Sequence, residues 1–172
     1  MRNAGSKAIY ILLTKYSDRL SKAIGLFPGC EYMHASIGLE DGKTFFSFNT
    51  KKGFCIEKPF NKVRSAPRML YRLDVPEHVH DDIAVRIQAF INDKGLYKFN
   101  YLGIVFCILR MPRWCIPLQR KDRYFCSQFV SELLSLSGAI KLHKSPLRFL
   151  PMDFSKDPQF RPCALPKIPQ VV

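Results

Sequence analysis

A cysteine and a histidine stand where they could act together as nucleophile and base. Cys126 opens an apolar run in the segment YFCSQFVSELL (124–134), and His34 lies 92 positions upstream (126 − 34) in YMHASIGLEDG (32–42). A thiol and an imidazole are the working parts of cysteine hydrolases and acyltransferases, in which the imidazole activates the sulfur to attack a carbonyl carbon. The first question is therefore which elements hold these two side chains.

The cysteine is predicted to stand in the first turn of a helix that runs from about Phe125 to Ser137 and stops at Gly138. Its apolar residues follow the i, i+3, i+4, i+7, i+8 spacing of one helix face. That face comprises Cys126, Phe129, Val130, Leu133 and Leu134. The thiol should therefore point inward, toward a sheet. The positive end of a helix dipole favours the thiolate, the reactive form of cysteine.

The histidine is predicted to lie on the first strand of a β-hairpin whose turn is the dipeptide Asp41-Gly42. Such a turn pairs positions whose numbers sum to 83, which sets Ser36 opposite Ser47 and His34 opposite Asn49. These residues share one strand face, and it carries mostly small side chains. Either Ser47 or Asn49 could hold the imidazole by a hydrogen bond, the third role in a nucleophile, base and orienter scheme.

The rest of the pattern predicts an α+β fold in which an antiparallel sheet packs against helices. Strands are expected at 7–14, 53–58 and 69–75, with a short helix from Ser17 and an amphipathic helix from Pro76 to near Gly95. The apolar segment 102–109 favours another short helix. A proline-rich tail from Pro146 is expected to wrap the surface. We find no repeat and no domain boundary, and we expect a single domain over residues 1–172.

Composition narrows the choice of partners. The formal net charge of +13 favours polyanions such as anionic lipid, acidic cell-wall polymer or nucleic acid. Nucleic acid is the least favoured, because the phenylalanines lie in runs typical of a core rather than among exposed basic residues. Six scattered cysteines favour reduced thiols, and no apolar run reaches the length of about 20 residues that spans a membrane. These features predict a cytoplasmic protein and leave its oligomeric state open.

Each candidate residue also has a structural interpretation. A cysteine on an apolar helix face is ordinarily part of a core, and Ser47 and Asn49 would be ordinary on an exposed strand face. Cys30 and His34, or His78 with His80, have spacings that could suit a metal. No second ligand pair follows at the spacing of a zinc site, so neither a metal nor another cofactor is predicted.

The segments HASIGLEDG, FFSF, YKFNYLG and YFCSQFVSELL, followed by PMDF, resemble the circularly permuted papain-like hydrolases of the NlpC type. The YiiX-like bacterial proteins are the most similar group, and lecithin:retinol acyltransferase is a more distant one. The resemblance runs from the first strand to about Phe154. It implies a papain-like core in which the histidine strand precedes the cysteine helix, the reverse of the order in papain.

The resemblance implies a general base at His34 and a nucleophile at Cys126. The family's third polar residue, commonly His or Glu, falls on Ser47, and Asn49 is the other candidate for that role. The backbone N–H of Cys126 would stabilise an oxyanion, with Tyr124 and Ser36 as further candidates near the substrate.

The predicted activity is that of a thiol hydrolase or acyltransferase that cleaves an amide or ester bond through an acyl-enzyme. The substrate would be a peptide-like amide or a lipid acyl group. The apolar and basic segment from Tyr101 to Arg123 resembles an interfacial surface more than a peptide groove, but its composition favours an ordinary core helix followed by a solvated basic loop. The alternative function is that of an inactive member of the fold that binds anionic lipid or cell-wall polymer, with Cys126 as a packing residue.

Overall fold

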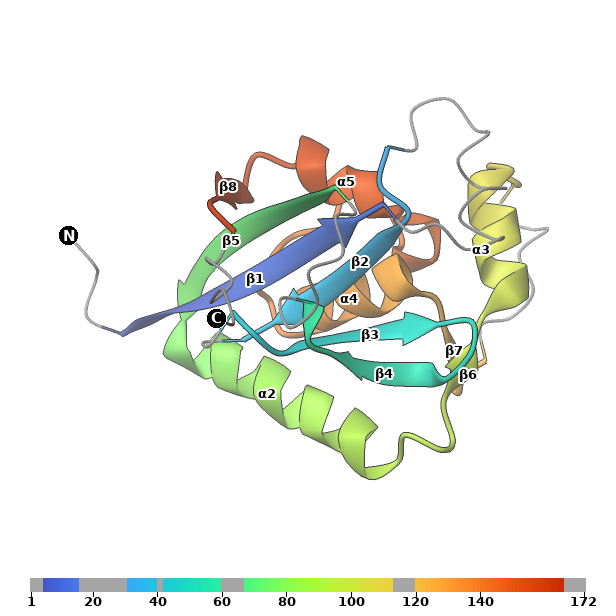
Figure 1. Cartoon of the computed structure of the whole chain (residues 1–172), viewed down its shortest axis with the longest axis horizontal. Coiled ribbons are helices and arrows are strands. Elements are labelled where there is room, and N and C mark those ends of the chain that lie inside the picture. Colours follow the sequence, from blue (N-terminus) through green and yellow to red (C-terminus); the bar gives the residue numbers. More distant parts are fainter. Residues whose placement is uncertain (1–4, 16–30, 40–41, 60–66, 113–119, 166–172) are drawn as a thin grey trace, which may run out of the picture.

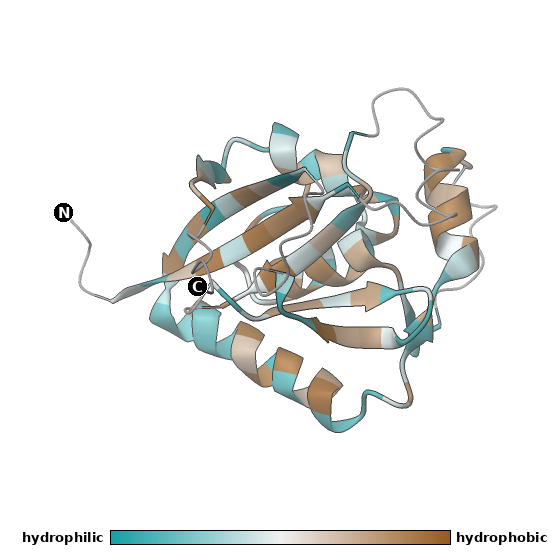
Figure 2. Cartoon of the chain, in the orientation of Figure 1, coloured by the Kyte–Doolittle hydropathy of each residue, from teal (hydrophilic) through white to brown (hydrophobic). Residues whose placement is uncertain are grey.

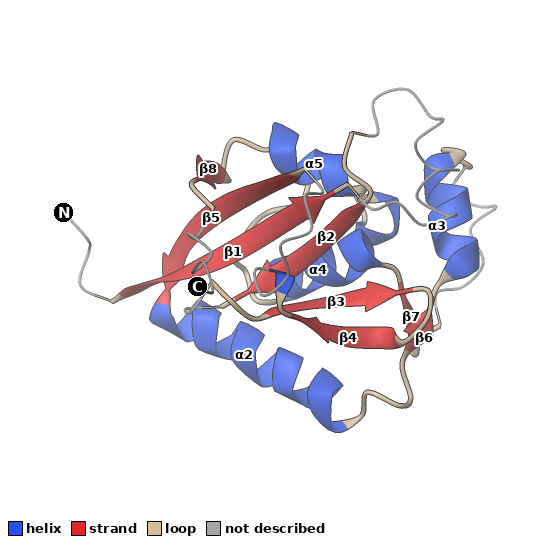
Figure 3. Ribbon diagram, in the orientation of Figure 1, coloured by secondary structure: helices blue, strands red, loops and turns tan. Residues whose placement is uncertain are grey.

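A six-stranded antiparallel sheet with helices around it forms this mixed α+β structure (Figures 1 and 3). The structure is a computed structural model and describes residues 5–15, 31–39, 42–59, 67–112 and 120–165. The strand order is β4-β3-β2-β1-β5-β8. The strands are β1 (Ser6–Thr14), β2 (His34–Gly38), β3 (Phe45–Asn49), β4 (Gly53–Glu57), β5 (Arg68–Pro76) and β8 (Arg161–Cys163).

Four α-helices are described, together with a short 3₁₀ helix, η3 (Pro146–Arg148), and a two-stranded parallel ladder. The helices are α2 (Glu77–Asn92), α3 (Tyr101–Ile108), α4 (Cys126–Leu136) and α5 (Pro151–Lys156), and the ladder pairs β6 (Lys98–Phe99) with β7 (Arg123–Tyr124). None of these helices is long and apolar enough to cross a membrane. The expected helix from Ser17 lies outside the described residues.

The hairpin of β2 and β3 has the predicted register. Ile37 pairs with Phe46 and Gly38 with Phe45, so the numbers of each pair sum to 83. The chain then turns through residues 50–52 and returns as β4, with Asn49 opposite Gly53. Gly53 has a φ of 68°, and a Cβ there would collide with the backbone carbonyl of Tyr97. Only glycine fits this turn without displacing the backbone beside it.

The core lies where α4 packs against β2 and β3. The predicted apolar face of α4 is buried, since Phe129, Val130, Leu133 and Leu134 are at most 3% exposed. They share one hydrophobic cluster with Ala35, Ile37, Phe48, Phe54, Ile83 and Ile87 from β2, β3, β4 and α2. Because strand side chains alternate between faces, the residues between these apolar ones, such as His34 and Ser47, point the other way.

The proline-rich tail is more than a surface wrap. Its prolines begin η3 and α5, where the first helical position needs no backbone N–H donor. Phe149, Phe154 and Phe160 are buried, and β8 extends the sheet by pairing with β5. The prediction of a tail that wraps the surface missed these elements because each is too short to show a period in the sequence.

Candidate functional site

Cys126 is the first residue of α4, as predicted. Phe125 before it is extended, and the helix start has neither a side-chain cap nor an acidic residue in its first turn. The positive end of the helix dipole is therefore not offset by a nearby carboxylate of the same turn. The residue is only 6% exposed, and its thiol donates weakly to the Met33 carbonyl oxygen at 4.0 Å. The start of α4 thus lies against the start of β2.

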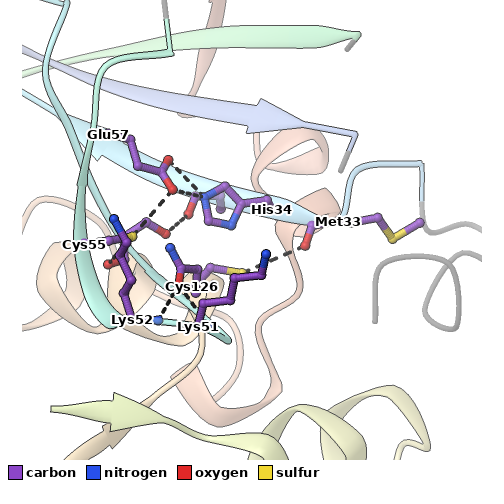
Figure 4. Close-up of polar contacts among 10 residues, drawn as sticks. Met33, His34, Lys51, Lys52, Cys55, Glu57 and Cys126 are labelled. Atoms are coloured by element: carbon purple, nitrogen blue, oxygen red, sulfur yellow. Dashed lines mark hydrogen bonds and ion pairs between the residues drawn. The ribbon is translucent and has the colours of Figure 1, made fainter. Parts of the chain in front are cut away.

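His34 opens β2 and lies against the carboxylate of Glu57, the last residue of β4. Its Nε2 is 3.0 Å from Oε1 and 3.1 Å from Oε2 of that carboxylate. Both side chains are largely buried, at 8% and 16% exposure. On its other side the imidazole interacts with Cys126. Figure 4 shows the ring between the Glu57 carboxylate and the Cys126 sulfur.

The charges of this group follow from its contacts. Burial lowers the pKa of His34, but the Glu57 charge and hydrogen bonds to Cys126 and Glu57 outweigh burial and raise that pKa to about 10. Burial likewise raises the pKa of Glu57, and the charge and hydrogen bond of His34 bring it below its usual range. At neutral pH the two form an imidazolium–carboxylate pair. A cationic imidazole beside a sulfur is the arrangement that favours nucleophilic cysteine.

Two further polar groups surround the carboxylate. The Cys55 thiol lies 3.4 Å from the Ser47 carbonyl oxygen and 3.6 Å from Glu57 Oε1. Burial, followed by the Glu57 charge, raises the pKa of Cys55 well above its usual range, so this thiol stays protonated and donates. The Ser36 hydroxyl is fully buried, has no hydrogen-bond partner of good geometry among the described residues, and lies where it helps to lower the pKa of Glu57.

The two predicted orienting residues have other contacts. The Ser47 hydroxyl donates to the Ala35 carbonyl oxygen at 2.7 Å and so joins β3 to β2. The Asn49 side-chain oxygen accepts from the backbone N–H groups of Lys51 and Lys52, at 3.1 and 2.8 Å, and so fixes the turn before β4. The side chain in contact with the imidazole is instead that of Glu57, one strand further along.

Tyr124, the predicted side-chain contributor to an oxyanion site, lies on β7 and is largely buried. Its hydroxyl donates to Glu132 Oε1 at 3.5 Å, and its ring packs against Phe48 and Phe90. Glu132 comes six residues after Cys126, a rise of about 9 Å along the helix axis. The phenol is therefore directed away from the start of α4, where the backbone N–H of Cys126 lies.

Glu57 was missed by the sequence reasoning, although a signal for it exists. The run TKKG (50–53) is typical of a hairpin loop that ends in a left-handed glycine, and it pairs Asn49 with Gly53. That register sets Ser47 opposite Cys55. Two residues further on, Glu57 must share the face of Ser47, because side chains alternate. The strand at 53–58 was predicted, but the prediction did not include which residues of the preceding strand it pairs with.

Comparison of the chain with family models, with curated proteins and with solved structures finds no match. Among the described residues, no group of three or more His, Cys, Asp or Glu side chains is arranged to hold a metal ion. The function is therefore inferred from the geometry of Cys126, His34 and Glu57 and from the order of their elements in the chain.

Proposed function

We propose that this protein is a thiol hydrolase or acyltransferase of the permuted papain-like type, which acts on an amide or ester bond through an acyl-enzyme. Cys126 is the nucleophile, His34 the base and acid, and Glu57 the residue that orients and charges the imidazole. One observation carries the proposal: a buried imidazole lies between a carboxylate, at 3.0 and 3.1 Å, and a cysteine at a helix N-terminus.

The chemistry follows from these positions. The Cys126 thiolate adds to the substrate carbonyl carbon, and the resulting oxyanion lies at the start of α4, where backbone N–H groups can stabilise it. The C–N or C–O bond then breaks, and the His34 imidazolium gives its proton to the leaving group. The neutral imidazole next takes a proton from water or from an acceptor alcohol or amine, which attacks the thioester and releases Cys126.

Glu57 is a stronger candidate than Ser47 for the residue that orients the imidazole of His34. A serine hydroxyl can orient an imidazole but brings no charge, whereas a carboxylate stabilises the imidazolium at each step in which it forms. A carboxylate in this role also agrees with the resemblance to the NlpC type, in which the third polar residue is commonly His or Glu. The chain order, with β2 and β4 before α4, supports the permuted arrangement.

Acyl-enzyme formation tests the proposal directly. We expect a p-nitrophenyl ester of a short fatty acid to acylate the folded protein once, at Cys126, with the added mass located by peptide mass spectrometry. Cys126→Ala should abolish this adduct, and His34→Ala should slow its formation by about a hundredfold, the usual contribution of a general base. Cys163→Ala is the matched control, because Cys163 lies on the edge strand β8. Acylation spread evenly over several cysteines, or absent altogether, would refute the proposal.

A further inference from the structure

The outer face of α3 carries an unusual group of exposed apolar side chains. Nine large hydrophobic residues are exposed in the described part of the chain, and four of them fall within residues 101–109. These four are Tyr101, Leu102, Val105 and Leu109, each between 44% and 61% exposed. The other five are scattered singly along the chain, which is normal for a protein surface. A cluster of four such residues along one short helix is unusual for a protein surface.

The opposite face of α3 is already used by the core. Ile104 and Cys107 are buried, and Gly103 lies against the side chain of Asn100. The helix is therefore apolar on both faces, although only one is covered by the described residues. Figure 2 shows its later turns as strongly hydrophobic at one end of the molecule, beyond the ends of the strands. An exposed apolar helix face of this kind is normally covered by an apolar partner.

Basic side chains surround this apolar face. Lys98 precedes α3, Arg110 follows it, and the Tyr101 hydroxyl donates at 2.8 Å to the Thr50 carbonyl oxygen, next to Lys51 and Lys52. All four basic residues are exposed, and none forms an ion pair with another described residue. Some basic side chains elsewhere do have acidic partners, as Arg72 has Asp74, Arg86 has Asp82 and Arg120 has Asp122. The charge beside α3 is thus available for an external anion.

We propose that this surface docks on an anionic lipid bilayer, and we call it the α3 face. It comprises Tyr101, Leu102, Val105, Leu109, Lys51, Lys52, Lys98 and Arg110. The apolar side chains would enter the boundary between headgroups and acyl chains, while the lysines and the arginine contact lipid phosphates. Aliphatic residues dominate this face, whereas a nucleic-acid surface needs aromatic side chains on which bases stack. The proposal goes beyond the acyl-transfer chemistry and does not depend on it.

A matched pair of valine variants tests the α3 face. We expect the wild-type protein to co-sediment with vesicles of equal parts phosphatidylglycerol and phosphatidylcholine, and binding to fall steeply toward about 0.5 M NaCl. Val105→Glu should weaken the vesicle partition coefficient by about tenfold, and adding Leu102→Glu should weaken it further. Val85→Glu, on the exposed side of α2, makes the same change at a residue with 68% exposure and should leave binding unaltered.

Three outcomes would overturn the proposal: no vesicle binding by the wild type, equal binding to pure phosphatidylcholine, or equal losses in the Val105 and Val85 variants. Far-UV circular dichroism and thermal melting of each variant separate lost binding from lost folding. Lys51→Gln with Lys52→Gln should reduce the salt dependence of binding while the apolar contribution remains. Cys126→Ala should bind vesicles as the wild type does, so failure of the docking surface and failure of the acyl-transfer chemistry are distinguishable.

Discussion

Helices α3 and α4 each carry a buried cysteine, yet the two thiols stand in opposite settings. Cys126 is the first residue of α4 and lies beside the imidazole of His34, whereas Cys107 is the seventh of the eight residues of α3. Burial above all raises the pKa of Cys107 to about 12, and the nearby charges of Lys144 and Asp153 oppose each other. Burial alone makes a thiol inert, whereas a helix start with a cationic neighbour favours the reactive thiolate form of a cysteine.

The largest expected effect is the difference in reactivity between these two thiols. At pH 7 a thiol with a pKa of about 12 is ionised to about one part in 10⁵, so Cys107 should scarcely react. Iodoacetamide should modify Cys126 at least about a hundredfold faster than Cys107 in the folded protein, as measured by quantitative peptide mass spectrometry. In guanidinium chloride the two rates should converge. Similar rates in the folded state would show that the start of α4 does not activate its cysteine.

The second largest effect should come from replacing Glu57, whose carboxylate pairs with the imidazole beside Cys126. Glu57→Gln keeps the shape of the side chain but removes the charge that helps to raise the pKa of His34. Alkylation of Cys126 at pH 7 should slow by about tenfold, because the imidazolium beside the sulfur loses the carboxylate that holds and stabilises it.

Glu132→Gln is the matched control for this variant. Glu132 is also a partly buried carboxylate and lies near the other end of α4, where it contacts the Tyr124 hydroxyl. Removing the Glu132 charge should leave the rate of Cys126 alkylation unchanged. If the two glutamine variants slow alkylation equally, the effect would belong to α4 as a whole and not to the carboxylate beside His34.

A moderate effect is expected in the pH dependence of stability. The pKa of His34 rises from 6.5 in the unfolded chain to about 10 in the folded protein. Between these values the folded state binds more protons than the unfolded state, so the free energy of unfolding should fall as the pH rises, by at most about 1.4 kcal/mol per pH unit. Below pH 6.5 this contribution is fully present. Urea unfolding from pH 6 to 9.5 measures it.

The reference for this measurement is the double variant His34→Gln with Glu57→Gln, which keeps two polar side chains but removes both titrating groups. The free energy of unfolding of this double variant should not show the decline with rising pH that His34 causes in the wild type. On the acid side, the lowered pKa of Glu57 stabilises the wild type above pH 4.5, and this advantage is lost as the pH falls further. Parallel curves for the two proteins would contradict the ion pair.

The smallest effect should come from Asn100, which links α3 to α4. Its side-chain oxygen accepts from the Gly103 N–H at 2.9 Å as the cap of α3, and its Nδ2 donates to Gln128 Oε1 at 3.3 Å. Asn100→Ala should lower the free energy of unfolding by about 1 kcal/mol without changing the alkylation rate of Cys126. Asn100→Asp keeps the cap and should recover most of the loss. A slower Cys126 in Asn100→Ala would show that α3 also positions the thiol.

Local rules were sufficient for the elements that bear the proposed nucleophile and base. The Asp-Gly turn predicted the register of β2 and β3, which the pairs Ile37–Phe46 and Gly38–Phe45 confirm. The apolar spacing predicted the buried face of α4, and Gly138, with a φ of 74°, lies directly after the helix as predicted. Each of these features depends on residues close together in sequence.

The third member of the site needed information of longer range. Glu57 reaches His34 only because β4 pairs with β3 and β3 with β2, so two registers must be combined to bring them together. Polar composition alone favoured Ser47 and Asn49, which lie on the adjacent strand. Their hydrogen bonds serve the backbone of the sheet and the turn, a competing use of polar side chains that no single-strand pattern distinguishes.

The distance in sequence between the parts of the site has a consequence for the timing of folding. Met33 and Cys126 are in contact although they are 93 positions apart in sequence, and Glu57 belongs to the earlier portion of the chain. During synthesis the ribosome releases His34 and Glu57 well before it adds Cys126. Contacts of such long range close late and slowly. A nascent chain therefore carries no assembled site, and the appearance of a fast-reacting thiol would mark the moment at which α4 docks on the sheet.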